Sequence, residues 1–120
     1  VPPATLRLTQ VALTSVVDEA QRAPAESLRT IEASRLLADG LYAYTAIHAP
    51  LGLSEKVVHV WRHEGRVVDR IELEVNGGRA EGYRAWTRKR NFPDEPRGRW
   101  QVQVLSADDR MIGTLRFRVE

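Results

Sequence analysis

The side chains best suited to hold a ligand are Arg84, Trp86 and Arg88, which alternate along residues 83–89. On a β-strand they share one face, because alternate residues point to the same side. An indole flanked by guanidinium groups can stack a planar ligand and attract an anion, and Trp and Arg are frequent anchors of protein interfaces. The pattern predicts a binding face, or else a half-buried Trp86 covered by the stems of the two arginines.

A second candidate pair, His59 and Trp61, lies in the run His-Val-Trp-Arg-His at residues 59–63. The pair forms either a binding face of aromatic and imidazole groups or a core Trp beside a hydrogen-bonded His. β-Sandwiches often bury a Trp on a central strand, which favours the second interpretation. On a strand His59 and His63 are roughly 13 Å apart, too far to share a metal ion. The chain also has no Cys, so we predict no metal site.

Tyr42 and Tyr44 form a third group, because their spacing places both rings on one face of a strand. Such a pair can serve as a platform on which a sugar ring stacks. Tyrosines at alternate strand positions are also commonly packed against the opposite sheet. The sequence leaves both interpretations open.

The short motifs that mark common catalytic sites are missing from the sequence. There is no Gly-rich phosphate loop, no His-Glu-x-x-His and no nucleophile elbow. Glu72 and Glu74 alternate on what we expect to be the solvent face of a strand. We therefore predict that the protein is not an enzyme and needs no cofactor.

The basic residues are unevenly distributed along the chain. Of the 18 basic residues 16 are Arg, and the net charge is only +2. Residues 61–120 hold 13 basic and 10 acidic side chains, whereas residues 1–60 hold 5 and 6. The densest run, named here the 84–90 patch, consists of Arg84, Arg88, Lys89 and Arg90. It predicts either a solvated strand end or a weak site for anions.

The elements that position these residues are predicted to be strands, because apolar and polar residues alternate along most of the chain. The 120 residues are enough for one hydrophobic core, so we predict a single domain over residues 1–120. Seven strands with tight turns favour an all-β, antiparallel β-sandwich of immunoglobulin-like architecture. The expected strands are 6–17, 41–48, 56–63, 67–75, 82–89, 99–106 and 111–119.

The connections follow from turn residues. Glu64-Gly65, Asn76-Gly77-Gly78 and Ala107-Asp108-Asp109 predict hairpin turns, and residues 92–98 with two prolines predict an exposed loop. Residues 25–37 are the one candidate helix, ended by Asp39-Gly40, although the segment could instead hold an irregular strand. The alternation slips at Gln10–Val11, which predicts a bulge.

One side of the core is predicted from the last two strands. Their inward positions are all large or β-branched and should meet on one face. These residues are Trp100, Val102, Val104, Leu115, Phe117 and Val119.

From Leu41 onward the chain carries an ordered set of motifs. They run from an aromatic-rich strand through His-x-Trp, a Gly turn, Arg-x-Trp-Thr-x-Lys and Gly-x-Trp-x-Val to Leu-x-Phe-x-Val. Here these motifs begin at Leu41, His59, Gly65, Arg84, Gly98 and Leu115. This order resembles an uncharacterised bacterial family, a domain of unknown function usually found at the C-terminal end of membrane-anchored proteins. Members usually have Ser where this chain has Thr87, and residues 1–40 match only loosely.

The resemblance implies an exported, mostly β domain in the periplasm or outside the cell, tethered to a membrane by an upstream anchor. It implies no reaction. We expect a non-catalytic binding or interaction module for an envelope glycan or a partner protein. Its ligand contacts would be Arg84, Trp86 and Arg88, with His59 and Trp61 in a supporting role.

One alternative is a purely structural accessory domain that packs on its own membrane part or self-associates. Another is weak binding of nucleic acid or polyanions by the 84–90 patch, which the low net charge disfavours. The oligomeric state stays open.

Overall fold

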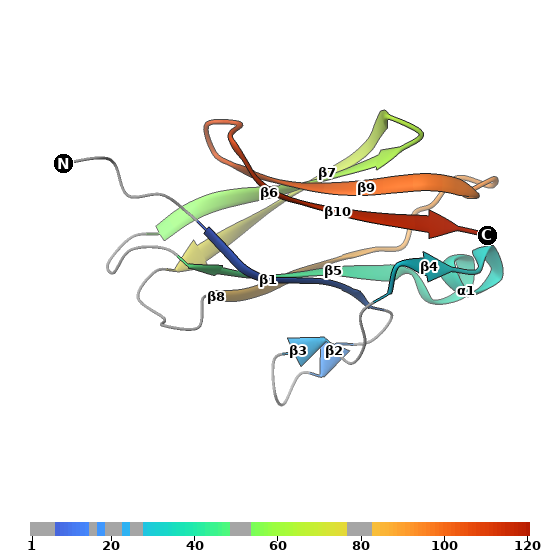
Figure 1. Cartoon of the computed structure of the whole chain (residues 1–120), viewed down its shortest axis with the longest axis horizontal. Coiled ribbons are helices and arrows are strands. Elements are labelled where there is room, and N and C mark those ends of the chain that lie inside the picture. The colour runs from blue at the N-terminus through green and yellow to red at the C-terminus, as the bar shows by residue number, and fades with distance from the viewer. Residues whose placement is uncertain (1–6, 15–16, 19–22, 25–27, 49–53, 77–82) are drawn as a thin grey trace.

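The structure, a computed structural model, describes residues 7–14, 17–18, 23–24, 28–48, 54–76 and 83–120. Within these ranges the chain is almost entirely β, with one short helix (Figure 1). The strands are β1 (Arg7–Thr14), β2 (Val17–Asp18), β3 (Ala23–Pro24), β4 (Thr30–Ile31), β5 (Leu41–His48), β6 (Ser54–His63), β7 (Arg66–Asn76), β8 (Tyr83–Lys89), β9 (Gly98–Ser106) and β10 (Met111–Val119); the helix is α1 (Ala33–Asp39).

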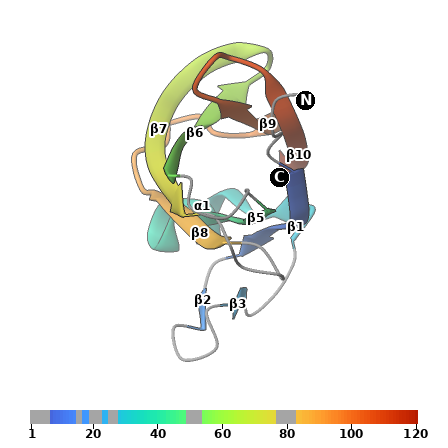
Figure 2. The ribbon, with the colours of Figure 1, turned by 90° about the vertical axis from the view of Figure 1, so that its left-hand side faces the viewer.

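Two sheets pack face to face and enclose the core. One has the strand order β1-β5-β8 and the other β4-β10-β9-β6-β7, while β2 and β3 form a separate two-stranded sheet. The end-on view shows the two layers, with β7 beside β8 at one side and β10 beside β1 at the other (Figure 2). The predicted β-sandwich is confirmed.

The strand order is that of an immunoglobulin-like sandwich. In such folds strands B and E share one sheet with A, while C, F and G form the other. Here β1, β5 and β8 take the places of A, B and E, and β10, β9, β6 and β7 those of G, F, C and C′. Strand β4 pairs in parallel with β10, whereas the other pairs described are antiparallel. The predicted fold class is therefore correct at the level of topology.

Local sequence signals explain most of the elements. The seven expected strands match β1 and β5–β10, with ends that differ by at most three residues. The register of β1 against β5 shifts between Leu8 and Gln10, close to the slip in the alternation. Glu64 and Gly65 have φ values of 50° and 84°, as a two-residue hairpin of the type I′ kind requires.

The predicted Asn76–Gly78 turn does not connect two strands that pair with each other. Residues 77–82 lie outside the described residues, but the strands on either side belong to different sheets: β7 pairs with β6, and β8 pairs with β5. The chain therefore crosses from one layer to the other here. An Asn-Gly pair permits a tight turn, but it does not decide which strands become partners.

The helix is shorter than predicted and starts later. Residues 25–27 lie outside the described part of the chain, and Thr30–Ile31 forms β4 instead of helix. Ile31 is buried and pairs with Val119, and the backbone of Glu120 bonds Ile31 on one side and Ala33 on the other. Burial against β10 thus overrides the local helix preference, and α1 ends at Asp39-Gly40 as expected.

The predicted core residues of β9 and β10 lie on the inner face. All are buried except Leu115, which is partly buried against the same cluster. Cross-strand pairing places Trp100 opposite Phe117 and Val102 opposite Leu115. In the described part of the chain no helix is long and apolar enough to cross a membrane.

Candidate functional site

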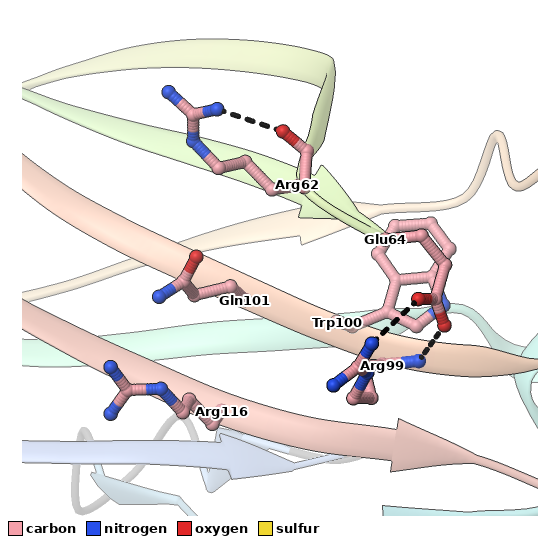
Figure 3. Close-up of a pocket in the computed structure, with 7 residues that line it drawn as sticks. Arg62, Glu64, Arg99, Trp100, Gln101 and Arg116 are labelled. Atoms are coloured by element: carbon pink, nitrogen blue, oxygen red, sulfur yellow. Dashed lines mark hydrogen bonds and ion pairs between the residues drawn. The ribbon is translucent and has the colours of Figure 1, made fainter.

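The outer face of the five-stranded sheet carries a groove lined by arginines. Gln101 on β9 pairs with Arg62 on β6 and with Arg116 on β10, so the three side chains stand in a row across the strands. Figure 3 shows this row, with Arg99 and Trp100 at one side of it. The groove has a volume of about 420 Å³ and is named here the basic groove; it is lined by Arg62, Glu64, Gly65, Arg99, Trp100, Gln101 and Arg116.

The arginines beside this row repel one another. Arg99 and Arg118 are direct cross-strand partners, and Arg116 is the diagonal neighbour of Arg99. Like charges directly opposite each other on a sheet are destabilising. The side chains of Arg116 and Arg118 form no hydrogen bond or ion pair with the residues described. The part of the sheet around Arg99, Arg116 and Arg118 therefore carries positive charge whose repulsion a bound anion would relieve.

Glu64 is the one carboxylate that lines the basic groove within the described residues. It accepts a hydrogen bond from the backbone N–H of Arg99 at 2.7 Å, and its other oxygen is 3.5 Å from the Arg99 guanidinium. The backbone hydrogen bond from Arg99 is the main cause that holds the pKa of Glu64 below its usual value. Gly98 makes room for this carboxylate, because a Cβ there would overlap it. One end of the groove is thus neutralised, while the Arg62–Arg116 row is not.

Arg62 is held in place by its own hydrogen bonds. Its Nε donates to Oε1 of Gln103 at 2.7 Å, and its Nη1 donates to the carbonyl oxygen of Gly65 at 3.0 Å. A guanidinium has five N–H donors, so further donors stay available for a ligand. The planar fork suits carboxylate, phosphate or sulfate groups, and the Gln101 amide can bond a hydroxyl. The donors of Arg62 and Gln101 are therefore of the kind that can bind an oxyanion.

Sequence reasoning missed the basic groove. The signal was the polar residues at alternate positions, with Arg99 and Gln101 in 99–106 and with Arg116 and Arg118 in 111–119, which mark the outer faces of both strands. What the sequence did not reveal is that β9 lies between β6 and β10 in the register that aligns Arg62, Gln101 and Arg116.

The predicted binding face lies on the opposite sheet, along β8. Arg84, Trp86 and Arg88 share the outer face as expected, since Ala85 and Thr87 between them are buried. A shallow hollow of about 240 Å³ is lined in part by Arg84 and Trp86. The three residues are therefore brought together, but on a less hollowed surface than the basic groove.

Contacts within the fold occupy much of this β8 face. The half-buried Trp86 ring stacks on Tyr44, with centroids 6.3 Å apart and planes 17° apart. Arg88 donates to the carbonyl oxygen of Asp39 at 2.8 Å, and its guanidinium lies 5.2 Å from the centre of the Tyr42 ring. Tyr44 is fully buried and Tyr42 is half-buried beneath Arg88, so the two tyrosines do not form an open platform.

Lys89 does not belong to a surface patch. Its side chain is 4% exposed and points between the sheets, where Nζ lies 2.9 Å from Oδ2 of Asp69 on β7. The hydrogen bond from Lys89 is the main cause that lowers the pKa of Asp69. The 84–90 patch therefore loses one of its four cations to the interior, which weakens the case for nucleic acid there.

His59 and Trp61 are core residues and offer no binding face. Both are 0% exposed. His59 lies between the sheets, with Nδ1 2.8 Å from Oγ1 of Thr87 and Nε2 3.3 Å from Oγ1 of Thr45. Burial lowers the pKa of His59 to about 4, so the ring is neutral at pH 7. The burial of both rings agrees with the interpretation of a core Trp beside a hydrogen-bonded His, and neither ring lies at a surface where a ligand could contact it.

His63 has a different role from His59. Its Nε2 bonds the carbonyl oxygen of Arg97 at 2.8 Å, and its ring stacks on Trp100 with centroids 4.4 Å apart. No group of three or more His, Asp or Glu side chains suited to a metal ion occurs among the residues described.

Comparison with known proteins identifies the family. A family model described as a protein of unknown function, DUF2914, matches residues 54–119, more than half of the chain. The chain belongs to this family. The DUF2914 match contains β6 to β10 and all residues of the basic groove.

A second model, a family of unknown function named DUF5924, matches residues 1–43. This segment includes β1, β4 and α1 and ends within β5. Strand β5 pairs with β8, which lies in the DUF2914 match, so residues of both matches meet in one sheet. No curated protein matches the chain.

Proposed function

We propose that this protein is a non-catalytic binding module that takes an anionic glycan in the basic groove. The observation that carries the proposal is the row of Arg62, Gln101 and Arg116 across three rigid strands, with Glu64 as the one described carboxylate that lines the groove. The hydrogen bonds of Arg62 to Gln103 and Gly65 hold its guanidinium in place, which lowers the entropic cost of a contact with a ligand. The groups that line it can form salt bridges and hydrogen bonds but include no nucleophile paired with a base.

A glycan suits the groove better than a nucleic acid. Proteins that bind single strands stack bases on exposed aromatic rings. Among the described residues every Trp, Tyr and Phe is buried or half-buried, and Trp100 in the groove is 2% exposed. The net charge of +2 is also low for nucleic-acid binding. Arg and Gln together can instead satisfy the carboxylates and hydroxyls of an acidic sugar.

The proposal includes a location outside the cytoplasm, in the periplasm or at the cell surface, next to an upstream membrane anchor. Its support is the resemblance to domains at the C-terminal ends of membrane-anchored proteins. A domain in that place meets the anionic glycans of the cell envelope.

The test compares two double variants of equal charge. Polygalacturonate, a carboxylated polymer, serves as the probe, and titration calorimetry measures its affinity. We expect Arg62→Gln with Arg116→Gln to weaken binding at least tenfold, since each cation near an anionic surface contributes about a factor of five. Arg84→Gln with Arg88→Gln should change the affinity less than twofold. Binding to the unchanged protein should weaken as salt rises.

If Arg84→Gln with Arg88→Gln weakens binding and Arg62→Gln with Arg116→Gln does not, the ligand lies on the β8 face. If polygalacturonate and sulfated glycans fail to bind the unchanged protein, the glycan proposal is wrong. The structural accessory role then becomes the better account, since Trp86 and Arg88 already contact Tyr44 and Asp39 within the fold.

A further inference from the structure

A second hollow adjoins the basic groove across β10. It has a volume of about 400 Å³ and is named here the Arg29 hollow; it is lined by Val11, Leu28, Arg29, Thr114, Leu115 and Arg116. Arg116 lines both hollows, so the two meet at this side chain. A ligand longer than one of them can therefore continue into the other.

The position of Arg29 is fixed by β10. The carbonyl oxygen of Arg29 accepts a hydrogen bond from the backbone N–H of Arg118 at 2.9 Å, and the next residue, Thr30, is the cross-strand partner of Arg118. The Arg29 side chain is exposed and makes no ion pair with the residues described. A third cation thus extends the line that starts at Arg62 and passes Arg116.

The spacing of these cations exceeds the size of one oxyanion. Arg62 and Arg116 stand on strands separated by β9, and adjacent strands lie about 4.8 Å apart, so their backbones are roughly 10 Å apart. Arg29 lies beyond β10, on the far side of Arg116. A single carboxylate or phosphate cannot contact all three guanidinium groups, whereas a chain with repeated charges can.

The walls of the Arg29 hollow favour a sugar chain over a simple ion. Leu28 and Leu115 pack against the core cluster but are only half-buried, so each presents apolar surface to the hollow at the edge of β10. Thr114 adds a hydroxyl oxygen, and no described carboxylate lines the hollow. The ring of a sugar presents C–H groups on its faces and hydroxyls at its rim, and these match an apolar wall beside polar groups. Charge attraction and apolar contact thus act together along one path.

We infer that the ligand is a linear anionic polysaccharide that lies across β6, β9 and β10, with successive acidic sugars in the basic groove and in the Arg29 hollow. This inference rests on the proposed function and adds the length and path of the ligand. It assigns to Arg29 a contact with the polymer that a single acidic sugar in the basic groove does not make.

The experiment measures the affinity of size-defined oligogalacturonates from the disaccharide to the dodecasaccharide. The proteins are the unchanged chain, Arg29→Gln and, as a control of equal charge, Arg90→Gln, which lies beyond β8 on the other sheet. We expect affinity to rise with length until both hollows are filled and then to level off. Arg29→Gln should weaken the dodecasaccharide about fivefold and leave the disaccharide unchanged. Arg90→Gln should affect neither.

The outcomes separate this inference from the proposed function. If short and long oligomers bind with equal affinity, and the double variant Arg62→Gln with Arg116→Gln loses this binding, the extended path is wrong and the basic groove remains the site. An equal effect of Arg29→Gln and Arg90→Gln would also overturn it. Absence of binding at every length would overturn both proposals. Tighter binding of a single-stranded oligonucleotide of equal charge would overturn the choice of polysaccharide.

Discussion

His59 on β6 and Thr87 on β8 are joined by a hydrogen bond of 2.8 Å that crosses from one sheet to the other. Thr45 completes the link. Its hydroxyl lies 3.3 Å from the carbonyl oxygen of Ala85, to which it donates, and its oxygen is the partner of His59 Nε2. The Nδ1 atom of His59 is then the acceptor for the Thr87 hydroxyl. Both ring nitrogens of a fully buried His are thus satisfied by the opposite sheet.

Thr87→Val should lower the free energy of unfolding by about 1–3 kcal/mol, because it leaves the buried Nδ1 of His59 without a donor. Thr87→Ser keeps the hydroxyl and should cost less than about 1 kcal/mol. Urea denaturation of the two variants measures the difference. Equal costs for Val and Ser would show that the hydrogen bond does not stabilise the fold.

The pKa of His59 predicts how stability changes with pH. Its pKa is lowered by burial to about 4 in the folded chain, against 6.5 for an ordinary His, so the unfolded chain binds more protons between these values. The free energy of unfolding should therefore fall by about 2 kcal/mol from pH 7 to pH 5. Asp69 and Asp108, whose pKa values are also lowered, contribute at more acidic pH, as they become protonated.

The variant His59→Gln should flatten the profile between pH 7 and pH 5, whatever its absolute stability. An NMR titration supplies a second measurement, since the imidazole of His59 should not titrate above pH 5 in the folded protein. A normal titration near pH 6.5 would contradict the buried neutral state.

The Lys89–Asp69 ion pair should respond asymmetrically to mutation. The Lys89 side chain is 4% exposed, whereas the Asp69 side chain is 37% exposed. Asp69→Asn leaves a buried ammonium without its counter-charge and should cost about 3 kcal/mol. Lys89→Met leaves only a hydrated carboxylate and should cost about 1 kcal/mol or less. Thermal and urea unfolding measure the stability cost of each variant. A larger cost for Lys89→Met than for Asp69→Asn would mean that the Lys89 ammonium reaches water.

Trp100 and Trp61 provide a matched pair in the core. Trp100 donates from Nε1 to the carbonyl oxygen of Pro96 at 2.7 Å, whereas Nε1 of Trp61 has no acceptor within the described part of the chain. Trp100→Phe should therefore cost about 1 kcal/mol more than Trp61→Phe. Trp100→Ala should cost roughly 3–5 kcal/mol, and a loss below 1 kcal/mol would contradict its place in the core.

Glu64→Gln should strengthen the proposed glycan binding about fivefold, because it removes the carboxylate that lines the basic groove. Glu95→Gln is the control of equal charge, since Glu95 pairs with Arg97 in an exposed loop. Calorimetric titration with polygalacturonate compares the two. An equal gain for both variants would indicate a response to net charge rather than to the groove.

The strands of this protein could be predicted from the sequence because their information is local. Alternation of apolar and polar residues in segments such as 99–106 and 111–119 reflects burial of one face, whichever strand lies alongside. The Glu64-Gly65 turn is equally local, since both residues tolerate positive φ. The core role of Trp61 followed from its position on a central strand.

The partners of each strand depend on the packing of the whole chain, and there the sequence was insufficient. Asn76–Gly78 has the sequence of a hairpin turn, yet β7 and β8 lie in different sheets, where β7 pairs with β6 and β8 pairs with β5. Lys89 has the local appearance of a surface cation. The approach of Asp69 from the other sheet supplies the counter-charge that makes its burial tolerable.

By itself the sequence determined the fold class, the strands and the faces on which most side chains lie, because alternation records burial. Only the tertiary structure decided which of those faces could bind a ligand. Arg84, Trp86 and Arg88 are neighbours in sequence, and their contacts lie partly within the fold. Arg62 and Arg116 are 54 positions apart and meet because β9 pairs with both of their strands in one register. A shift of one residue in either pairing would turn their side chains to opposite faces and remove the groove.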